Sequence, residues 1–304
     1  MARDNQDLTK GPLARKILFF SAPLIVSNLL QVLFNVADIA VVGRFAGASA
    51  LGSVGSTTIL VTMFTSFLIG VSGGINVLTA LYLGSGDRKG VRETVHSAFL
   101  FSILTGLTLL LIGAIFSKGI LELLNTKPEL IDGAVLYIRI YFLGVVGNLI
   151  YNMGAAILRA VGDSKRPLYF LIASCFVNIV LDLLFVAVFH WEVMGAAVAT
   201  ILSQFVSAVL VMMVLVRSKD SYHVSLKEIR INRHIVRRIF RIGLPAGFQS
   251  AMYSISNIII QSSVNGFGTD TVAAWSAYSK IDGVFWMTMS AFGIAVTTFV
   301  GQNY

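Results

Sequence analysis

The chain has 304 residues, of which 56% are hydrophobic and only 12% are charged, and its formal net charge is +8. Soluble domains carry about 25% charged residues, so this composition excludes an ordinary soluble enzyme, a disordered protein and a nucleic-acid-binding protein. The single cysteine, Cys175, excludes an internal disulfide and a cysteine-based zinc site.

The apolar runs predict an all-α integral membrane protein. A helical crossing requires roughly 20 apolar residues, and eight runs meet this requirement. In chain order they lie at 17–42, 54–82, 97–117, 140–158, 167–189 and 193–216, followed by one that begins at 242 and one that begins near 283.

The basic residues predict the orientation of these spans. Eighteen of the 23 lysines and arginines, among them Arg3 and Lys10, precede the first span or follow the second, fourth and sixth, which places them on one side of the membrane. The positive-inside rule then predicts a multi-pass protein of the cell (inner) membrane with a cytoplasmic N-terminus. Eight of these residues lie in the segment 217–241. For that segment, binding of anionic lipid headgroups and a purely topological role both stay open.

An internal repeat relates the first two spans to the last two. A displacement of 222 residues aligns Pro23 with Pro245 and Asn35 with Asn257, within six identities over 31 positions. Six spans separate the copies, so both copies cross the membrane in the same direction, as in parallel-repeat transporters. We therefore expect a six-span N-terminal lobe at 1–216, a basic cytoplasmic linker at 217–241, and the first two spans of an incomplete C-terminal lobe at 242–304.

Two acidic residues, Asp38 and Asp182, lie well inside the apolar runs. At the centre of a span each costs about 2.5–3.5 kcal/mol, and acids in such positions usually serve a function. Two interpretations stay open: a carboxylate that binds a cation, and a protonated or hydrogen-bonded carboxyl group that holds helices together.

Other polar residues of the first and fourth runs are candidates for lining a cavity. Gln31 and Asn35 share a helix face with Asp38, because Gln31 precedes Asn35 by four residues and Asn35 precedes Asp38 by three. Asn148 and Asn152 share a face of the fourth run, where cavity lining and simple interhelical hydrogen bonds both stay open.

Three further polar residues are expected near the two acids. Ser174 and Asn178 share a face with Asp182, and Thr200 lies among small residues of the sixth run. Ser174 is a further candidate for lining the cavity. At 1.5 Å per residue, Asp182 is about 22 Å from the cytoplasmic start of its span and Thr200 about 10 Å from the outer start of its own. In a core of about 30 Å these depths are similar, and Asp38 also lies towards the outside. The expected cluster is Asp38, Asn178, Asp182 and Thr200.

The chemistry of this expected cluster suits a small cation. Carboxylate, amide and hydroxyl oxygens are the ligands that a hard cation prefers, so a sodium ion is one candidate. A proton carried by Asp38 or Asp182 is the other. Within the first run, Pro23 lacks a backbone N–H and is expected to kink the helix, either as a static bend or as a moving hinge.

Together these motifs resemble the multidrug and toxic compound extrusion (MATE) family of secondary transporters. The resemblance extends from about residue 9 to the end of the chain. It is carried by a first span that contains Pro23 and runs through Asn35-x-x-Asp38 to Val42-Gly43, by Leu158-Arg159-Ala160-x-Gly162-Asp163, by Asn178-x-x-x-Asp182, and by Gly195-Ala196-Ala197-x-Ala199-Thr200.

The resemblance implies two six-helix lobes around a central cavity and the export of drug-like cations in exchange for sodium ions or protons. It implies that Asp38 and Asp182 are the coupling carboxylates and that Asn178 and Thr200 are neutral ligands. Family members have twelve spans, so we expect this chain to be truncated at its C-terminus. No catalytic residue and no cofactor beyond the coupling ion are expected.

Two alternatives remain besides an exporter. A lipid-linked glycan flippase of the same superfamily would favour a basic cavity, whereas the buried charges here are acidic. An intramembrane aspartyl enzyme would show Gly-x-Gly-Asp within a span, but the nearest match, at 160–163, lacks the first glycine and lies in a loop. The expected partners are small cationic organic substrates and the lipid bilayer, without nucleic acid or an ATPase subunit.

Overall fold

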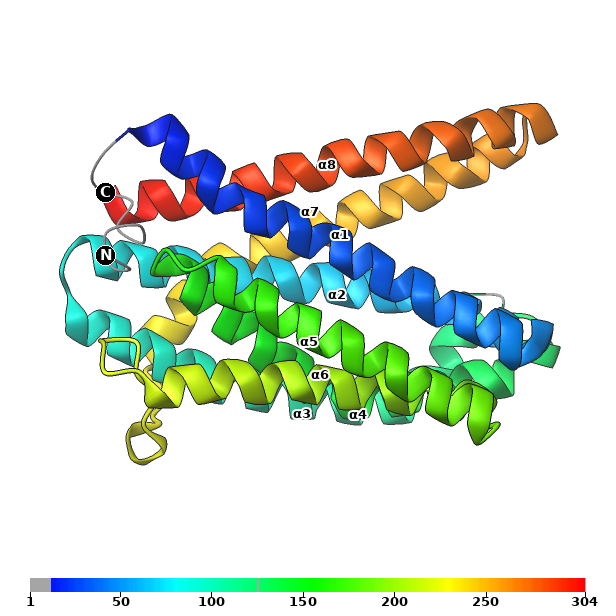
Figure 1. The fold of residues 1–304 in the computed structure, drawn as a ribbon, viewed down its shortest axis with the longest axis horizontal. Coiled ribbons are helices and arrows are strands. Elements are labelled where there is room, and N and C mark those ends of the chain that lie inside the picture. Colours follow the sequence, from blue (N-terminus) through cyan, green and yellow to red (C-terminus); the bar gives the residue numbers. More distant parts are fainter. Residues whose placement is uncertain (1–11, 125, 304) are drawn as a thin grey trace.

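The structure is a computed structural model that describes residues 12–124 and 126–303. As expected for an all-α membrane protein, nearly all of these residues are helical (Figure 1). Basic residues Arg3 and Lys10, which the topology prediction uses, lie outside the described residues. The eight long helices are α1 (Leu13–Phe45), α2 (Gly47–Gly84), α3 (Arg88–Leu123), α4 (Pro128–Ala160), α5 (Lys165–Asp182), α6 (Glu192–Arg217), α7 (Arg233–Asn265) and α8 (Thr269–Asn303).

Seven helices of the described chain are long and apolar enough to cross a membrane, and α7 is the long helix that falls short. Residues 242–265 of α7 carry no charge, but Gln249, Asn257 and several serines lower their hydropathy. The helix begins at Arg233 rather than at 242, so residues 233–241 of the expected linker are helical and the connection from α6 spans 218–232. Helix α8 begins at Thr269 rather than near 283. The expected span was defined as an uninterrupted apolar run, and the first turns of α8 include charged residues that interrupt such a run.

Helix α4 lies at the centre of the first six helices and packs against α2, α3 and α6. Close approach depends on glycines at these contacts. Gly113 of α3 lies against the ring of Phe142, and Gly144 and Gly154 of α4 lie against side chains of α6. A Cβ atom at any of the three would collide with its neighbour. Small residues at helix contacts allow this approach in membranes, where apolar burial alone does not drive association.

Helices α7 and α8 pack against α2 and α1. Helix α7 runs along α2, and α8 contacts both α1 and α2. Phe20 and Leu24 of α1 form a small buried cluster with Ala291 and Ala295 of α8. Towards the connection between α7 and α8, this pair diverges from α1 (Figure 1). The 222-residue displacement maps α1 onto α7 and α2 onto α8, so the α1–α8 and α2–α7 contacts correspond to each other.

Candidate cation-coupling site

Helices α1, α5 and α6 pack together and bring the two expected acids into one buried cluster. Asp38 of α1 is 7% exposed, and Asn178 and Asp182 of α5 are fully buried. The hydroxyl oxygen of Thr200 on α6 lies 3.4 Å from Asp38 Oδ2. The side chains of Asn178 and Asp182 also lie next to the Asp38 carboxyl group. The structure therefore places the other three residues of the expected cluster beside Asp38.

Several polar atoms in this cluster lack hydrogen-bond partners among the described residues. They are Asp38 Oδ1, both carboxyl oxygens of Asp182, and both polar atoms of the Asn178 amide. Thr200 has a single hydroxyl proton, and its oxygen also lies 2.9 Å from the carbonyl oxygen of Ala196. Burying such groups without partners is unfavourable, so the cluster favours a species that supplies positive charge. A sodium ion held by these oxygens or a proton on a carboxyl group fits this set.

Asp182 lies where helix α5 changes its hydrogen-bonding pattern. The π-helix η1 (Leu183–Val188) follows directly, and Phe189 N–H donates to the carbonyl oxygen of Leu184 at 2.9 Å. Single π-turns within α-helices occur frequently at functional sites. The sequence carries no signal for this change, because residues 183–189 form one more apolar stretch.

The turn from η1 into α6 determines where Thr200 lies relative to Asp182. His190 and Glu192 have positive φ angles of 54° and 44°, which are uncommon for residues with a side chain. Gly195 at the start of α6 packs against Phe185, so the two helices approach closely just before Thr200.

Tyr137 of α4 belongs to the surroundings of the site, although no pattern in the sequence indicates this. It is 7% exposed and lies close to Asp38, Asp182 and Thr200. Its ring stacks on that of Tyr141 with centroids 6.5 Å apart. A tyrosine in an apolar span usually indicates packing, and only the tertiary structure shows that Tyr137 lies beside the two acids.

Ser174, Asn148 and Asn152, which were expected to line a cavity, make hydrogen bonds away from the cluster around Asp38. Ser174 donates a hydrogen bond to the carbonyl oxygen of Ser203 at 2.6 Å, which links α5 to α6. Asn152 donates to the side-chain and backbone oxygens of Asn148 at 2.8 and 2.9 Å, so this pair is bonded within α4. Within residues 12–124 and 126–303, neither asparagine makes the interhelical hydrogen bond that was one of the two alternatives.

The polar residues along one face of α1 are partly exposed and partly in contact with other helices. Gln31 and Asn35 are exposed, whereas Asp38 on the same helix is buried. Asn28 donates a hydrogen bond to the carbonyl oxygen of Met287 in α8 at 3.0 Å. Helix α1 continues without interruption through Pro23.

The donor set does not resemble a transition-metal site. The described residues contain no group of three or more histidine, cysteine, aspartate or glutamate side chains that could hold a metal ion. The cluster offers two carboxyl groups, one amide and one hydroxyl, all of which present oxygen.

Comparisons with known proteins agree with this fold. The MatE family model matches residues 23–184 and 245–304, two segments whose first residues are 222 positions apart, as in the internal repeat. "Probable multidrug resistance protein YpnP" and "Probable multidrug resistance protein YoeA", both of Bacillus subtilis (strain 168), are 32% and 30% identical to the chain over 98% of its length. The chain spans 66% of each of these relatives.

A solved structure of a MATE protein in the bent conformation matches with a TM-score of 0.90 at 24% sequence identity. The match covers 98% of this chain and 68% of that one.

Proposed function

The chain belongs to the MatE family, and from this premise we propose that it forms the cation-coupled part of a secondary exporter of small organic cations. The activity rests on the buried cluster of Asp38, Asn178, Asp182 and Thr200. Among the described residues, Asp38 Oδ1, both carboxyl oxygens of Asp182 and the amide oxygen of Asn178 have no hydrogen-bond partner. The chain is a multi-pass membrane protein. Its relatives are transporters rather than enzymes, so the aspartyl-enzyme alternative is discarded.

The cluster couples ion binding to helix packing because its ligands come from three helices. Two neighbouring carboxylates repel each other strongly where water is scarce. A bound sodium ion or proton removes this repulsion and favours packing of α1 against α5 and α6. Release of the ion favours separation of α1. An ion that binds one arrangement more tightly shifts the population towards it, which is the physical basis of exchange.

The charge of the cluster supports a cationic substrate. Both acids in the centre of the first six helices, Asp38 and Asp182, are buried. A flippase for a lipid-linked pyrophosphate would favour basic residues in such a position, so we rank this alternative second.

We place the ends of α2 and α6 and the starts of α3 and α7 in the cytoplasm. These ends lie on the same side of the helix bundle (Figure 1). They carry basic residues, including Arg88, Lys89 and Arg92 on α3 and Arg217 on α6, as the positive-inside rule requires. The orientation is testable by the accessibility of single cysteines introduced at these ends of the Cys175→Ser variant.

Sodium binding to the purified chain tests the site directly, because the cluster lies entirely within α1, α5 and α6. Radioactive sodium should bind the wild type and fail to bind Asp38→Asn. Asp132→Asn is the matched control, since Asp132 is an exposed acid on α4. In proteoliposomes that contain the whole exporter of which the chain forms part, an imposed sodium or pH gradient should drive efflux of a fluorescent organic cation. Efflux that is equal in Asp38→Asn and in the wild type contradicts the coupling role.

A further inference from the structure

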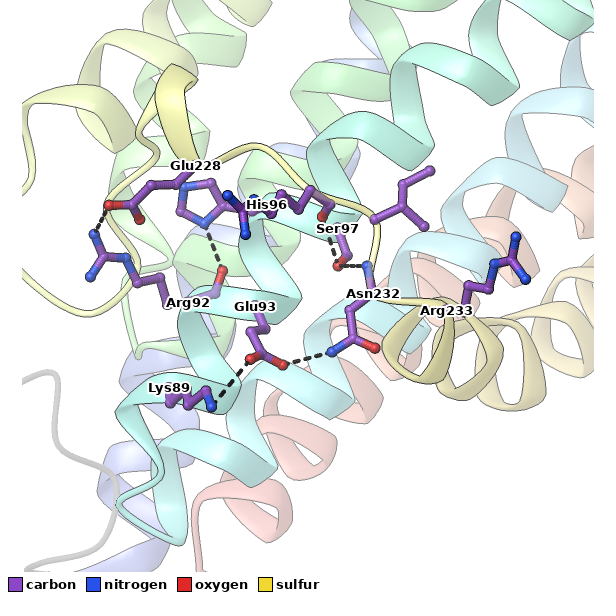
Figure 2. A pocket seen from close by; sticks show the side chains of 10 residues that line it. Lys89, Arg92, Glu93, His96, Ser97, Glu228, Asn232 and Arg233 are labelled. Atoms are coloured by element: carbon purple, nitrogen blue, oxygen red, sulfur yellow. Dashed lines mark hydrogen bonds and ion pairs between the residues drawn. The ribbon is translucent and has the colours of Figure 1, made fainter.

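A buried histidine lies at the proposed cytoplasmic end of the bundle. His96 of α3 is 3% exposed and lines a cavity of about 530 Å³ between the first turns of α3 and the connection 218–232, which leads from α6 into α7 (Figure 2). It shares no contact with the cation cluster of α1, α5 and α6 among the hydrogen bonds of the described residues. A role for His96 is therefore independent of the proposed function.

Both ring nitrogens of His96 have hydrogen-bond partners. Nδ1 lies 2.7 Å from the backbone carbonyl oxygen of Arg92, one turn earlier in α3 (Figure 2). Nε2 lies 3.0 Å from the backbone nitrogen of Ser225 in the connection and accepts its N–H. A carbonyl oxygen can only accept and a backbone N–H can only donate, so the ring proton is on Nδ1 and Nε2 is unprotonated. The two contacts therefore fit the neutral ring in a single tautomer.

Other contacts attach a later part of the connection to the same stretch of α3. The hydroxyl oxygen of Ser97 accepts the backbone N–H of Asn232 at 3.1 Å, and Glu93 accepts a hydrogen bond from the side-chain nitrogen of Asn232 at 2.8 Å. Glu228 forms an ion pair with Arg92. Hydroxyl, carboxylate and guanidinium groups ordinarily keep their charge between pH 5 and pH 8, whereas an imidazole ordinarily changes its charge there.

The charged side chains that line the cavity beside His96 come from three elements. They are Lys89, Arg92 and Glu93 of α3, Glu228 and Arg230 of the connection, and Arg233 of α7. Glu228 is paired with Arg92, and Glu93 lies 4.0 Å from the ammonium group of Lys89. In the described part of the chain, neither carboxylate is bonded to the imidazole ring. A proton added at Nε2 therefore faces the N–H of Ser225, with which it cannot form a hydrogen bond.

Further charged or titratable groups lie on the elements packed around this end of α3. The connection carries Lys219, Asp220, His223 and Lys227, and the first turns of α7 carry His234, Arg237 and Arg238. The same end of α4 carries Arg159, whose Nε donates to the carbonyl oxygen of Ala155 at 3.0 Å. Helix α2 has no charged residue, and its Tyr82 hydroxyl accepts a hydrogen bond from Arg238 at 2.8 Å.

We propose that the contact between His96 and Ser225 is a pH-sensitive latch, which holds the connection against α3 while the ring is neutral. A proton on Nε2 turns the acceptor of the latch into a donor, so two donors then face each other. Because the closed latch requires the neutral ring, a fall in pH shifts the population towards the open latch. Acidification of the cytoplasmic side therefore frees the connection around Ser225, while Asn232 stays attached to α3 through Ser97.

Amide hydrogen exchange of the purified full chain tests the latch, because its donor is a backbone N–H. The protection of the Ser225 amide is compared at about pH 7.5 and about pH 5.5, with labelling times scaled to the intrinsic exchange rate at each pH. His96→Gln offers an amide oxygen as acceptor and does not gain a proton in this range, whereas His96→Phe keeps a flat ring without an acceptor. The matched control is His234→Gln, which removes an exposed histidine from α7.

We expect the protection of the Ser225 amide to fall at least about tenfold from the higher to the lower pH in the wild type and in His234→Gln. Protection should be independent of pH in both His96 variants, high in His96→Gln and low in His96→Phe. The Asn232 amide is the internal reference, because its acceptor is the Ser97 hydroxyl, and its protection should change by less than about twofold.

Two results would overturn the proposal. The first is equal protection of the Ser225 amide at both pH values in the wild type. The second is a pH dependence that persists in His96→Gln. His223→Gln identifies the source in that second case, because the buried Nδ1 of His223 has no hydrogen-bond partner among the described residues. Loss of the pH dependence in His223→Gln alone would assign the switch to His223.

Discussion

The hydroxyl group of Thr298 donates a hydrogen bond to Asn76 Oδ1 at 3.2 Å, and these two residues are 222 positions apart. This separation is the displacement that relates α1 and α2 to α7 and α8. Two residues related by a twofold repeat can touch only where the axis passes between them. The local axis of the repeat therefore passes between α2 and α8, and a buried polar contact marks its position.

Removal of this contact should destabilise the packing of the two repeats. Thr298→Val keeps the shape of the side chain but leaves Asn76 Oδ1 without its donor. We expect a loss of about 0.5–2 kcal/mol, seen as a lower thermal unfolding midpoint in detergent. Thr297→Val is the control, because Thr297 is exposed on the same helix. Equal midpoints for the two variants would contradict a structural role for the Thr298 contact.

Two adjacent glycines of α2 should respond differently to the same substitution. A Cβ atom at Gly74 would collide with the backbone of α7 at Gly243, whereas nothing lies within 4 Å of a Cβ atom at Gly73. Gly74→Ala should destabilise the protein by about 1–3 kcal/mol by forcing α2 and α7 apart. Gly73→Ala should be neutral or stabilise it by up to about 1 kcal/mol through helix propensity. Thermal unfolding compares the two, and a larger loss for Gly73→Ala would refute this packing.

Neutralising one carboxyl group of the cluster should abolish ion binding without lowering the stability of the fold. Asp182→Asn removes the repulsion between two buried acids, so its unfolding midpoint in sodium-free buffer should equal or exceed that of the wild type. It should also lose any increase in midpoint that sodium gives the wild type. A variant that is destabilised and still responds to sodium would place the ion elsewhere. Asp132→Asn again provides the control for loss of one acid.

The hydroxyl group of Tyr137 should contribute to ion binding. Tyr137→Phe removes one polar group beside Asp38 and Asp182, which should weaken cation binding by about fivefold, the value of one typical hydrogen bond. Tyr141→Phe should change it by less than twofold, because the Tyr141 hydroxyl lies 3.2 Å from Thr65 Oγ1. Titration of radioactive sodium against each variant measures the difference. Equal weakening would assign the effect to the stacked ring pair rather than to the hydroxyl of Tyr137.

The amino-acid sequence is sufficient to predict features that depend on a single helix. Apolar runs indicated where helices lie, and the high cost of a buried charge singled out Asp38 and Asp182. The spacing of Asn178 to Asp182 was enough to place them on one face. The repeat displacement also followed from residue identities alone, since it needs no knowledge of how the helices pack.

Features that depend on how helices face one another were decided only by the tertiary structure. The rotation and crossing of α4 place Tyr137 beside the acids, and glycine contacts set how closely its neighbours approach. The same packing leaves Gln31 and Asn35 exposed, although they share a face with Asp38. The π-turn after Asp182 has no counterpart in the uniformly apolar residues 183–189. The meeting of Asn76 with Thr298 is a contact between distant segments. Such contacts leave no periodic pattern in the sequence, because each depends on the positions of residues far along the chain.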